Sequence, residues 1–502
     1  MSCKTIVTRL IKSSCVLFIL LIIGGCAAKN TGLKGSPDSP EAACLQFYQD
    51  LNRVVFANHA EDTSEVRVSG FPYLRSNRFL ASLWAPSFSE AAYAQWLEQL
   101  RQLDAQARIL EFANLPDGDA AKIISRLPAD ISFQQHIQKC GRLLVKTMLS
   151  KGLQDKAELS AGTIVPDDYQ TWKRIAGAYP VLRFAADIGI NDLHRELNKP
   201  FHLPAGQIPV AGKLLRYQPD PLIALTRHEV SGMLEAAYQN PLKIPLLKPD
   251  QLDRLFGHFA PVWEIDTRNR TDLIGAVTLG DSGKPMIDTG KPTVYVKLAY
   301  TRFHGENLLQ LIYQVWLPAR EKTGSFDLYG GELDSVIWRI TINRQGLPIA
   351  YDSIHACGCY YLLFPAKGYR ALAGTEEAEP VLSPKQVTVD PYEQRLLIRL
   401  AARTHYLQQI SELKDSMKAK PYWIMAYDRL RSLQAPDGQH RNLFGPEGII
   451  ETSARSERFL LWPFGVASPG AMRQWGSHAI AFVGRRHFDD PYLLEELIVP
   501  QK

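Results

Sequence analysis

Three residues that can bind metals or take part in redox chemistry stand at alternate positions in the middle of the chain: His355, Cys357 and Cys359. Thiolate and imidazole groups are preferred ligands of zinc, and copper is an alternative. In an extended backbone alternate side chains share one face, with their alpha carbons about 6.6 Å apart. Gly358 would let the chain curl so that the three ligands converge. This segment is therefore one candidate for a metal site, in which zinc would be the cofactor.

Two other states of these cysteines stay open. A disulfide between Cys357 and Cys359 would also need a curled chain, because full extension leaves the alpha carbons near the upper limit of separation for such a bond. The third alternative is a pair of inert thiols buried behind the aromatic rings of Tyr360, Tyr361 and Phe364. Metal ligands, a disulfide and buried thiols thus remain three separate expectations for one short segment.

β-Strands are predicted to position this segment. Alternation of apolar with polar residues indicates half-buried strands, with a tight turn before the last of them, over 293–300, 308–317, 335–342 and 347–354. Because Pro348 lacks a backbone donor, the fourth strand is expected to lie at a sheet edge or to begin beyond this residue. A simple antiparallel meander of the four strands brings the 318–334 loop and His355 to the same end of the sheet.

Three carboxylates lie in or beside that loop and are the candidate catalytic residues: Asp327, Glu332 and Asp334. Each could serve as a further ligand or as a general base for a metal-bound water, which is the arrangement of a metal-dependent hydrolase. The alternative is structural, because acidic residues that flank Gly330 and Gly331 are more often turn formers or solvated.

A second constellation of charged residues lies near the C-terminus. It consists of His478 with Arg485, Arg486 and His487, followed closely by Asp489. Arginine can bind phosphate or carboxylate, and histidine changes its charge near neutral pH, so the group is a candidate site for an anion or another ligand. The competing interpretation is an ion-paired loop, because neighbouring arginines and aspartates can satisfy each other.

The first thirty residues determine where the protein is expected to work. Lys4, Arg9 and Lys12 precede an unbroken apolar run over 15–23, and two glycines then lead into Cys26. The run is shorter than the roughly 20 residues that span a bilayer. The segment resembles a bacterial lipoprotein signal with its lipobox. That resemblance implies cleavage before Cys26, attachment of lipid chains such as palmitate at this cysteine, and transport to the outer membrane, with the body facing the periplasm.

Cysteine usage and charge agree with an envelope protein. In an oxidising compartment Cys44 and Cys140, which lie in two segments of helical periodicity, are expected to form a disulfide. Loss of the three positive residues of the signal lowers the formal net charge of the chain from +5 to +2. So small a charge argues against a nucleic-acid partner, which would need a concentrated basic face.

The 502 residues are 46% apolar and 22% charged, which is ordinary for globular domains and enough for more than one core. The expected fold class is α+β, with these parts: a signal over 1–25, a flexible tether over 26–40, a mainly helical domain over 41–200, an antiparallel β-rich domain over 201–385, and a mixed region over 386–502. Within the last part, the spacing of Leu396, Leu397, Leu400, Ile410 and Leu413 predicts a long helix.

Two functions are compatible with these features. The first is a non-enzymatic lipoprotein, held to the membrane by the lipid on Cys26, that binds or scaffolds an envelope protein or a cell-wall partner. The second is a metal-dependent envelope hydrolase that uses the zinc site at His355, Cys357 and Cys359. The sequence favours the first, because it lacks the common catalytic signatures such as Gly-x-Ser-x-Gly and His-Glu-x-x-His.

Overall fold

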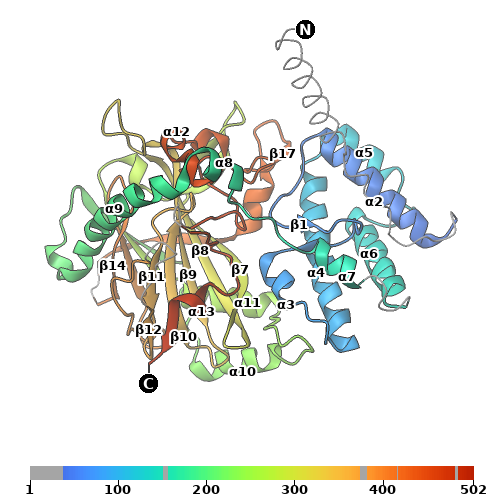
Figure 1. Ribbon diagram of the computed structural model, residues 1–502, viewed down its shortest axis with the longest axis horizontal. Helices are drawn as coiled ribbons and strands as arrows, with labels where there is room; N and C mark the ends of the chain where they lie inside the picture. Colours follow the sequence, from blue (N-terminus) through green and yellow to red (C-terminus); the bar gives the residue numbers. More distant parts are fainter. Residues whose placement is uncertain (1–37, 151–155, 373–380, 415–416, 481–483, 502) are drawn as a thin grey trace, which may run out of the picture.

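The computed structural model describes residues 38–150, 156–372, 381–414, 417–480 and 484–501. It confirms the α+β class, because a group of helices formed by the N-terminal part of the chain stands beside a large mixed sheet (Figure 1). The signal, Cys26 and most of the tether lie outside the described residues, so the lipid anchor stays a prediction. Among the helices that are described, none has the length and apolarity that a bilayer span requires.

The helical part follows the periodicity of its sequence. Its elements are α2 (Pro40–Ala57), β1 (Val66–Arg67), β2 (Arg75–Ser76), α3 (Arg78–Leu83), α4 (Glu90–Ala113), α5 (Asp117–Ile124), α6 (Phe133–Ser150) and α7 (Lys156–Gly162). Side chains of Ser39 and Ser89 accept hydrogen bonds from the first turns of α2 and α4, which fixes where these helices begin. Trp96 and Leu100 of α4 are completely buried and form the centre of this core.

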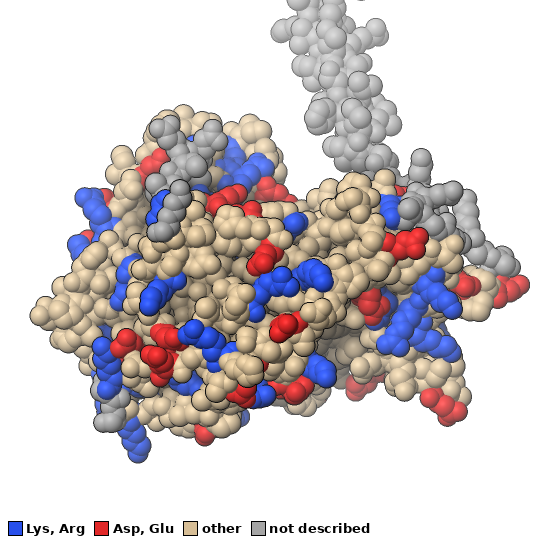
Figure 2. Space-filling model, turned by 90° about the horizontal axis from the view of Figure 1, so that it is seen from below, with Lys and Arg blue, Asp and Glu red and all other residues tan. Residues whose placement is uncertain are grey.

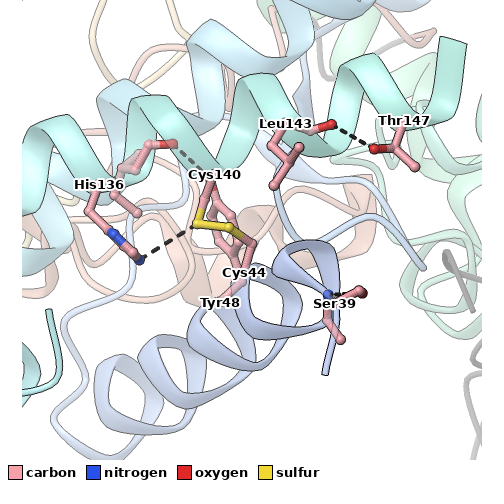
Figure 3. Close-up of a disulfide and its surroundings, with 9 residues drawn as sticks. Ser39, Cys44, Tyr48, His136, Cys140, Leu143 and Thr147 are labelled. Atoms are coloured by element: carbon pink, nitrogen blue, oxygen red, sulfur yellow. Dashed lines mark hydrogen bonds between the residues drawn. A yellow bond between two sulfur atoms is a disulfide. The ribbon is translucent and has the colours of Figure 1, made fainter. Parts of the chain in front are cut away.

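A disulfide joins two helices of this part. Cys44 on α2 and Cys140 on α6 are bonded, with their alpha carbons 5.3 Å apart, and the sequence-based pairing is confirmed (Figure 3). The hydroxyl of Tyr48, one turn further along α2, donates to the carbonyl of Ile137 at 3.3 Å. Because the bond closes a long loop of the chain, it restricts the unfolded state and holds α2 against α6.

Within the described residues, the large sheet has ten strands. Their spatial order is β11 (Leu362–Pro365), β10 (Pro348–His355), β9 (Gly331–Ile342), β8 (Glu306–Arg320), β7 (Thr293–Phe303), β15 (Ala419–Ala426), β3 (Lys213–Pro219), β4 (Val262–Thr267), β13 (Leu396–Leu400) and β14 (Leu407–Glu412). Strands β7 to β10 form the expected antiparallel meander, and β11 extends it by a further antiparallel strand. The sheet as a whole is mixed, because β15 runs parallel to both β7 and β3, and β13 runs parallel to β4.

The remaining elements surround the sheet. They are α8 (Thr171–Ala176), α9 (Tyr179–Asn198), η2 (Lys199–His202), η3 (Ala205–Gln207), α10 (Arg227–Ala237), α11 (Pro249–Phe259), η4 (Arg270–Asp272), β5 (Ala276–Leu279), β6 (Pro285–Asp288), β12 (Tyr369–Ala371), η5 (Tyr427–Arg431), β16 (Leu433–Gln434), β17 (His440–Arg441), η6 (Glu451–Ser453), α12 (Arg458–Leu461), η7 (Trp462–Phe464), α13 (Leu493–Leu497) and β18 (Ile498–Pro500). Residues of α10 and α11 pack on one face of the meander, and the C-terminal segments pack on the other.

This double covering corrects the expectation of half-buried strands. Strand β8 is buried on both faces over most of its length. Its polar residues are paired inside the protein, since Gln310 donates to the hydroxyl of Thr341 at 3.2 Å and Gln314 donates to that of Ser335 at 2.8 Å. The alternating polar positions of β8 therefore mark cross-strand hydrogen bonds within a covered sheet, and not a face in contact with water.

Two other expectations were wrong. Residues 396–413 form the strands β13 and β14 instead of a long helix, because both ends of this short apolar run pair within the sheet and the turn between them has left-handed residues at Arg403 and His405. Strand β10 begins at Pro348 and lies between β9 and β11, so it is not an edge strand. The proline is tolerated there because its register is irregular and regular pairing begins at Ala350.

The helical part is joined to the sheet part by buried charges. The guanidinium of Arg431, on η5, lies 2.6 Å from the carboxylate of Asp62 and 3.1 Å from that of Glu65, and both acids follow α2. Burial alone would raise the pKa of Asp62, but the charges of Arg431 and Arg75 lower it to about 2. Glu111 on α4 behaves similarly, because Arg75 and other arginines lower its pKa to about 2.

These depressed pKa values predict acid lability. A carboxylate whose pKa is lower in the folded state stabilises the protein above its unfolded pKa, and this stability is lost as the pH falls through the folded value. We expect Asp62 and Glu111 each to contribute roughly 2 kcal/mol, lost from about pH 4 downwards. Replacement of Arg431 by Met should lower the free energy of unfolding at pH 7 by about 3–5 kcal/mol and move acid unfolding to higher pH.

The measurement is urea unfolding followed by circular dichroism at several pH values. Arg429→Met is the matched control, because Arg429 lies on the same short element and its side chain is exposed. If Arg431→Met unfolds with the same free energy and pH profile as Arg429→Met, the buried charges do not hold the two parts together.

Candidate functional site

The segment with His355, Cys357 and Cys359 does not continue as a strand. Strand β10 ends at His355, and the chain then turns so that the N–H of His355 donates to the carbonyl of Cys359 at 3.0 Å. Gly358 has a φ of +88°, and a Cβ at this position would lie 2.3 Å from the carbonyl oxygen of Ala479. The expected alternation of the three side chains on one extended face is therefore wrong, because a glycine turn begins directly after the histidine.

Both cysteines are free thiols in the structure, so the disulfide between Cys357 and Cys359 is not formed. Their side chains are buried, with relative exposures of 7% and 6%. A hydrogen bond to Cys357 and burial raise the pKa of the Cys359 thiol well above its usual value. A protonated, shielded thiol is a poor nucleophile and a poor metal ligand.

His355 takes part in a buried network of histidines and aspartates. Its Nδ1 lies 3.5 Å from Asp334, while Nδ1 of His405 lies 2.7 Å from the other oxygen of the same carboxylate. Nε2 of His405 lies 3.2 Å from Asp272. Burial alone would raise the pKa of Asp334, but the neighbouring His355 and His405 hold it well below the ordinary value. Asp334 is thus a charge partner between two imidazoles.

The two histidines respond to this network in opposite directions. Burial would lower the pKa of His405, but hydrogen bonds to Asp272 and Asp334 raise it above the ordinary value. Burial lowers the pKa of His355, despite the opposing effect of Asp334. The ring of His355 also contacts those of Tyr360 and Tyr406. The arrangement suits an internal ion pair that fixes the ends of β9, β10 and the β13–β14 turn.

The other two candidate carboxylates do not join His355. Asp327 accepts hydrogen bonds from the backbone of Thr323, Tyr329 and Gly330 in the loop before β9. Although burial opposes it, these N–H groups lower the pKa of Asp327 to about 2, so its carboxylate closes a turn. Glu332 is exposed at the start of β9. Asp334 is therefore the one predicted carboxylate that the structure brings to the histidine.

The zinc hypothesis finds no support in this geometry. Across the described residues, no group of three or more histidine, cysteine or carboxylate side chains is arranged so that it could hold a metal ion. A turn of the backbone follows His355 and contains Cys357 and Cys359, while Nδ1 of His355 faces Asp334. Zinc at this segment stays a prediction from the sequence.

The C-terminal constellation is divided among several protein contacts. Arg485 pairs with Asp167 at 2.9 Å, and His487 lies 3.4 Å from Asp167 and 3.3 Å from Asp168, in the loop before α8. His478 is buried at 1% exposure, and burial together with Arg473 lowers its pKa to about 3. Arg486 is also buried. These contacts connect the C-terminal segment to residues 167–168.

A groove with different properties lies between the helical part and the sheet part. Its volume is about 580 Å³, which is in the range of ordinary ligand sites. Its walls come from segments far apart in the sequence: the C-terminal ends of α2 and α4, the β5–β6 hairpin, β17 with the loop after it, and η6. Its polar lining residues include Glu61, Asn114, Asn442 and Thr452. We call this site the interdomain groove.

Four residues of the interdomain groove each carry a shielded polar atom without a hydrogen-bond partner in the described part of the chain. These atoms are Oε2 of Glu61, Oδ1 of Asn114, Nδ2 of Asn442 and Oγ1 of Thr452. Each such atom costs about 1–3 kcal/mol when its partner is missing. Others, such as Nε1 of Trp338, are scattered through the described chain, whereas these four gather around one cavity. Four of them around one groove indicate that a bound molecule or water completes the site.

The orientation of both amides is fixed by their other contacts. Nδ2 of Asn114 donates to the carbonyl of Arg431 at 2.9 Å, so the other polar atom of this amide, Oδ1, is the one without a partner. Oδ1 of Asn442 accepts from the N–H of Phe444 at 3.1 Å, which leaves its nitrogen unpaired. The groove therefore offers two acceptors, one donor and one hydroxyl that can do both.

The backbone around the interdomain groove is also unusual. His59 lines the groove with a φ of +51°, a left-handed conformation that costs energy in a residue other than glycine. Charged residues of both signs stand at its walls, including Glu451 and Arg441, and the guanidinium of Arg441 pairs with Asp437. The groove is thus mixed in charge, as is the lower face of the molecule, where acidic and basic side chains are interspersed (Figure 2).

Sequence reasoning missed the interdomain groove for a clear reason. Its polar residues do not form a motif, because Asn114 and Asn442 are more than three hundred positions apart and meet only after folding. The one local signal is the loop over 436–448, which is rich in proline and glycine and carries several polar side chains.

Adjacent hydroxyls allow a direct test of the unpaired atoms. We expect Thr452→Val to raise the free energy of unfolding by about 1 kcal/mol, because it replaces an unpaired buried hydroxyl with a methyl group of the same shape. Ser453→Ala is the matched control and should lower it by about 1–2 kcal/mol, because Oγ of Ser453 donates to Ile450 and accepts from Met472. Urea unfolding measures the free energy of unfolding of both variants. If Thr452→Val is destabilised as much as Ser453→Ala, the hydroxyl of Thr452 is not an unpaired group.

No family model, curated protein or solved structure matches this chain, so its function is argued from the interdomain groove and the chemistry of its walls.

Proposed function

We propose that this protein is a lipoprotein of the outer membrane that faces the periplasm and binds a polar component of the cell envelope in the interdomain groove. The observation that carries the proposal is the set of four unpaired polar atoms on Glu61, Asn114, Asn442 and Thr452. A site whose buried polar groups lack partners is less stable when empty than one that is fully paired. Such a cost is typical of binding sites, where stability is exchanged for function.

The chemistry of the unpaired atoms indicates the class of ligand. Oxygens of Glu61 and Asn114 require donors, whereas the nitrogen of Asn442 requires an acceptor. A molecule with hydroxyl and amide groups supplies both kinds within a few ångströms. In the periplasm, fragments of the cell wall combine sugar hydroxyls with peptide and acetyl amides, so we assign a cell-wall glycopeptide to this groove.

The lipid anchor is supported by the signal and by the disulfide. The signal resembles that of bacterial lipoproteins and ends at Cys26. The disulfide between Cys44 and Cys140 is the kind of bond that forms and persists in an oxidising compartment such as the periplasm. Both features favour an envelope protein.

Mass spectrometry tests the anchor. We expect the full-length gene, expressed in a Gram-negative host, to yield a membrane-bound product that begins at Cys26 and is heavier than its peptide mass by its lipid chains. Cys26→Ser should abolish processing and acylation, and Cys15→Ser, inside the apolar run, is the matched control. A product that retains residues 1–25, or that lacks lipid, would contradict this part of the proposal.

Titration with a soluble muropeptide mixture tests the groove. We expect the wild-type protein to bind, and Thr452→Val to weaken binding by about 1–2 kcal/mol, or roughly tenfold, because one hydrogen bond is lost. The same variant should be more stable in the absence of ligand, a combination that simple damage to the fold does not produce.

Thr147→Val is the control for this titration, because it removes a half-buried hydroxyl on α6 outside the groove. It should bind as the wild type does. Absence of muropeptide binding, or equal affinity of Thr452→Val and wild type measured by isothermal titration calorimetry, would contradict the proposed ligand site.

A further inference from the structure

Large apolar side chains are exposed on three neighbouring elements that do not line the interdomain groove. On α8, α9 and α12 the exposed fractions are 64% for Trp172, 75% for Ile175, 72% for Val181, 73% for Phe184, 68% for Ile188 and 72% for Phe459. Single exposed apolar residues are normal, but a contiguous group of this kind marks an interaction site. We call these six residues the apolar surface.

The three elements are in direct contact. The N–H of Gln170, just before α8, donates to the carbonyl of Gly465, just after η7, at 2.9 Å. The ring of Tyr179, at the start of α9, lies 5.9 Å from that of Phe464 on η7, which continues α12. Figure 1 shows α8 and α12 near the top of the molecule and α9 descending from α8 along its left side. The six side chains therefore belong to one region.

Helix α9 presents apolar residues to solvent as well as to the protein. Val181, Phe184 and Ile188 follow a spacing of three and four residues and so share one side of the helix, which is exposed. Ile190 and Leu197 lie on the opposite side and are half-buried and buried, respectively. That opposite side suffices to pack the helix on its own protein. The exposed apolar side of α9 is thus available to an apolar partner.

The occupant that fits this region is a bilayer surface. Its residues protrude from separate helices, and a bilayer accepts protruding side chains without complementary shape. Two of the aromatic rings carry a cation beside them, since Lys173 lies 5.7 Å from the ring of Trp172 and Arg458 lies 4.8 Å from that of Phe459. Aromatic and basic residues together are typical of segments that lie at the interface of anionic membranes.

The chain that precedes the described residues also leads to a membrane. Cys26, which follows the apolar run over 15–23, lies only twelve residues before Asp38. A chain of that length spans at most about 40 Å, so a lipid on Cys26 would keep the body close to the bilayer. Such an anchor limits the distance of the body from the bilayer but leaves its orientation open, and a second contact would fix that orientation.

We propose that the apolar surface rests on the phospholipid leaflet that holds the lipid anchor, with Trp172, Phe184 and Phe459 in the interfacial region. This proposal rests on the proposed membrane attachment and adds an orientation to it. With α8, α9 and α12 against the bilayer, the body has one defined face toward the membrane, and the interdomain groove has a fixed position relative to the cell wall.

Quenching of tryptophan fluorescence by brominated lipids tests the contact. The full-chain protein, purified from membranes, is reconstituted into vesicles of phosphatidylethanolamine and phosphatidylglycerol with brominated acyl chains. We expect bromine-dependent quenching of the wild type, and loss of most of it in the Trp172→Phe, Trp462→Phe double variant, because these two side chains are the exposed tryptophans of α8 and η7. Trp84→Phe, in the helical part, is the matched control and should retain the quenching.

The outcomes separate this proposal from the anchor. Vesicle-bound, acylated protein without quenching, or with quenching that survives the double variant, overturns the membrane contact and leaves the anchor intact. Protein that carries no lipid yet still floats with vesicles and shows Trp172-dependent quenching supports the contact and contradicts the anchor. Dimers in detergent that dissociate in Phe184→Asp would assign the apolar surface to a second copy of the chain and would overturn the proposal.

Discussion

The position of one guanidinium group determines how the two parts of this protein meet. Arg431 is almost completely buried and lies against Asp62 and Glu65, which come from the chain that follows α2. An unpaired charge at this depth would be far too costly, so the contact between the parts is obligatory. The carbonyl of the same residue accepts the amide of Asn114. Arg431 therefore holds the helical part against the sheet part, and these two parts form the walls of the interdomain groove.

The sheet and the interdomain groove differ in how their buried polar groups are paired. Within the sheet, Gln310 and Gln314 find partners on the neighbouring strand, and Arg339 pairs with Asp352. These pairs add specificity to the fold because both partners are satisfied, although Nε1 of Trp316 and Nε1 of Trp338, in the same strands, lack a partner in the described chain. Around the groove, hydroxyl and amide atoms such as those of Thr452 and Asn442 are left without partners in the described chain. The groove differs from the sheet because its unpaired donors and acceptors come from separate segments of the chain and lie around one cavity.

The sequence predicted local features well and long-range ones poorly. Alternation located β7, β8 and β9, and the meander that it implied brought Asp334 to His355. Periodicity failed over 396–413, because a run of five buried residues has no period that separates a helix from a strand covered on both faces. Alternation also failed beyond His355, where the close approach of Ala479 to Gly358 decides the turn. Neither the elements that cover the strand at 396–400 nor the approach of Ala479 can be inferred from residues adjacent in the sequence.

The same limit explains why the most reactive residue types lie away from the groove. Cys357, Cys359 and His355 attract attention because their chemistry is rich, yet burial protonates one thiol and pairs the imidazole with Asp334. The reactivity of a side chain depends on its exposure and its interaction partners, and both follow from tertiary packing. Asparagine and threonine carry no such chemistry, but at Asn442 and Thr452 packing withholds their partners. In this protein the capacity to bind arises from contacts left unmade, which only the folded chain can define.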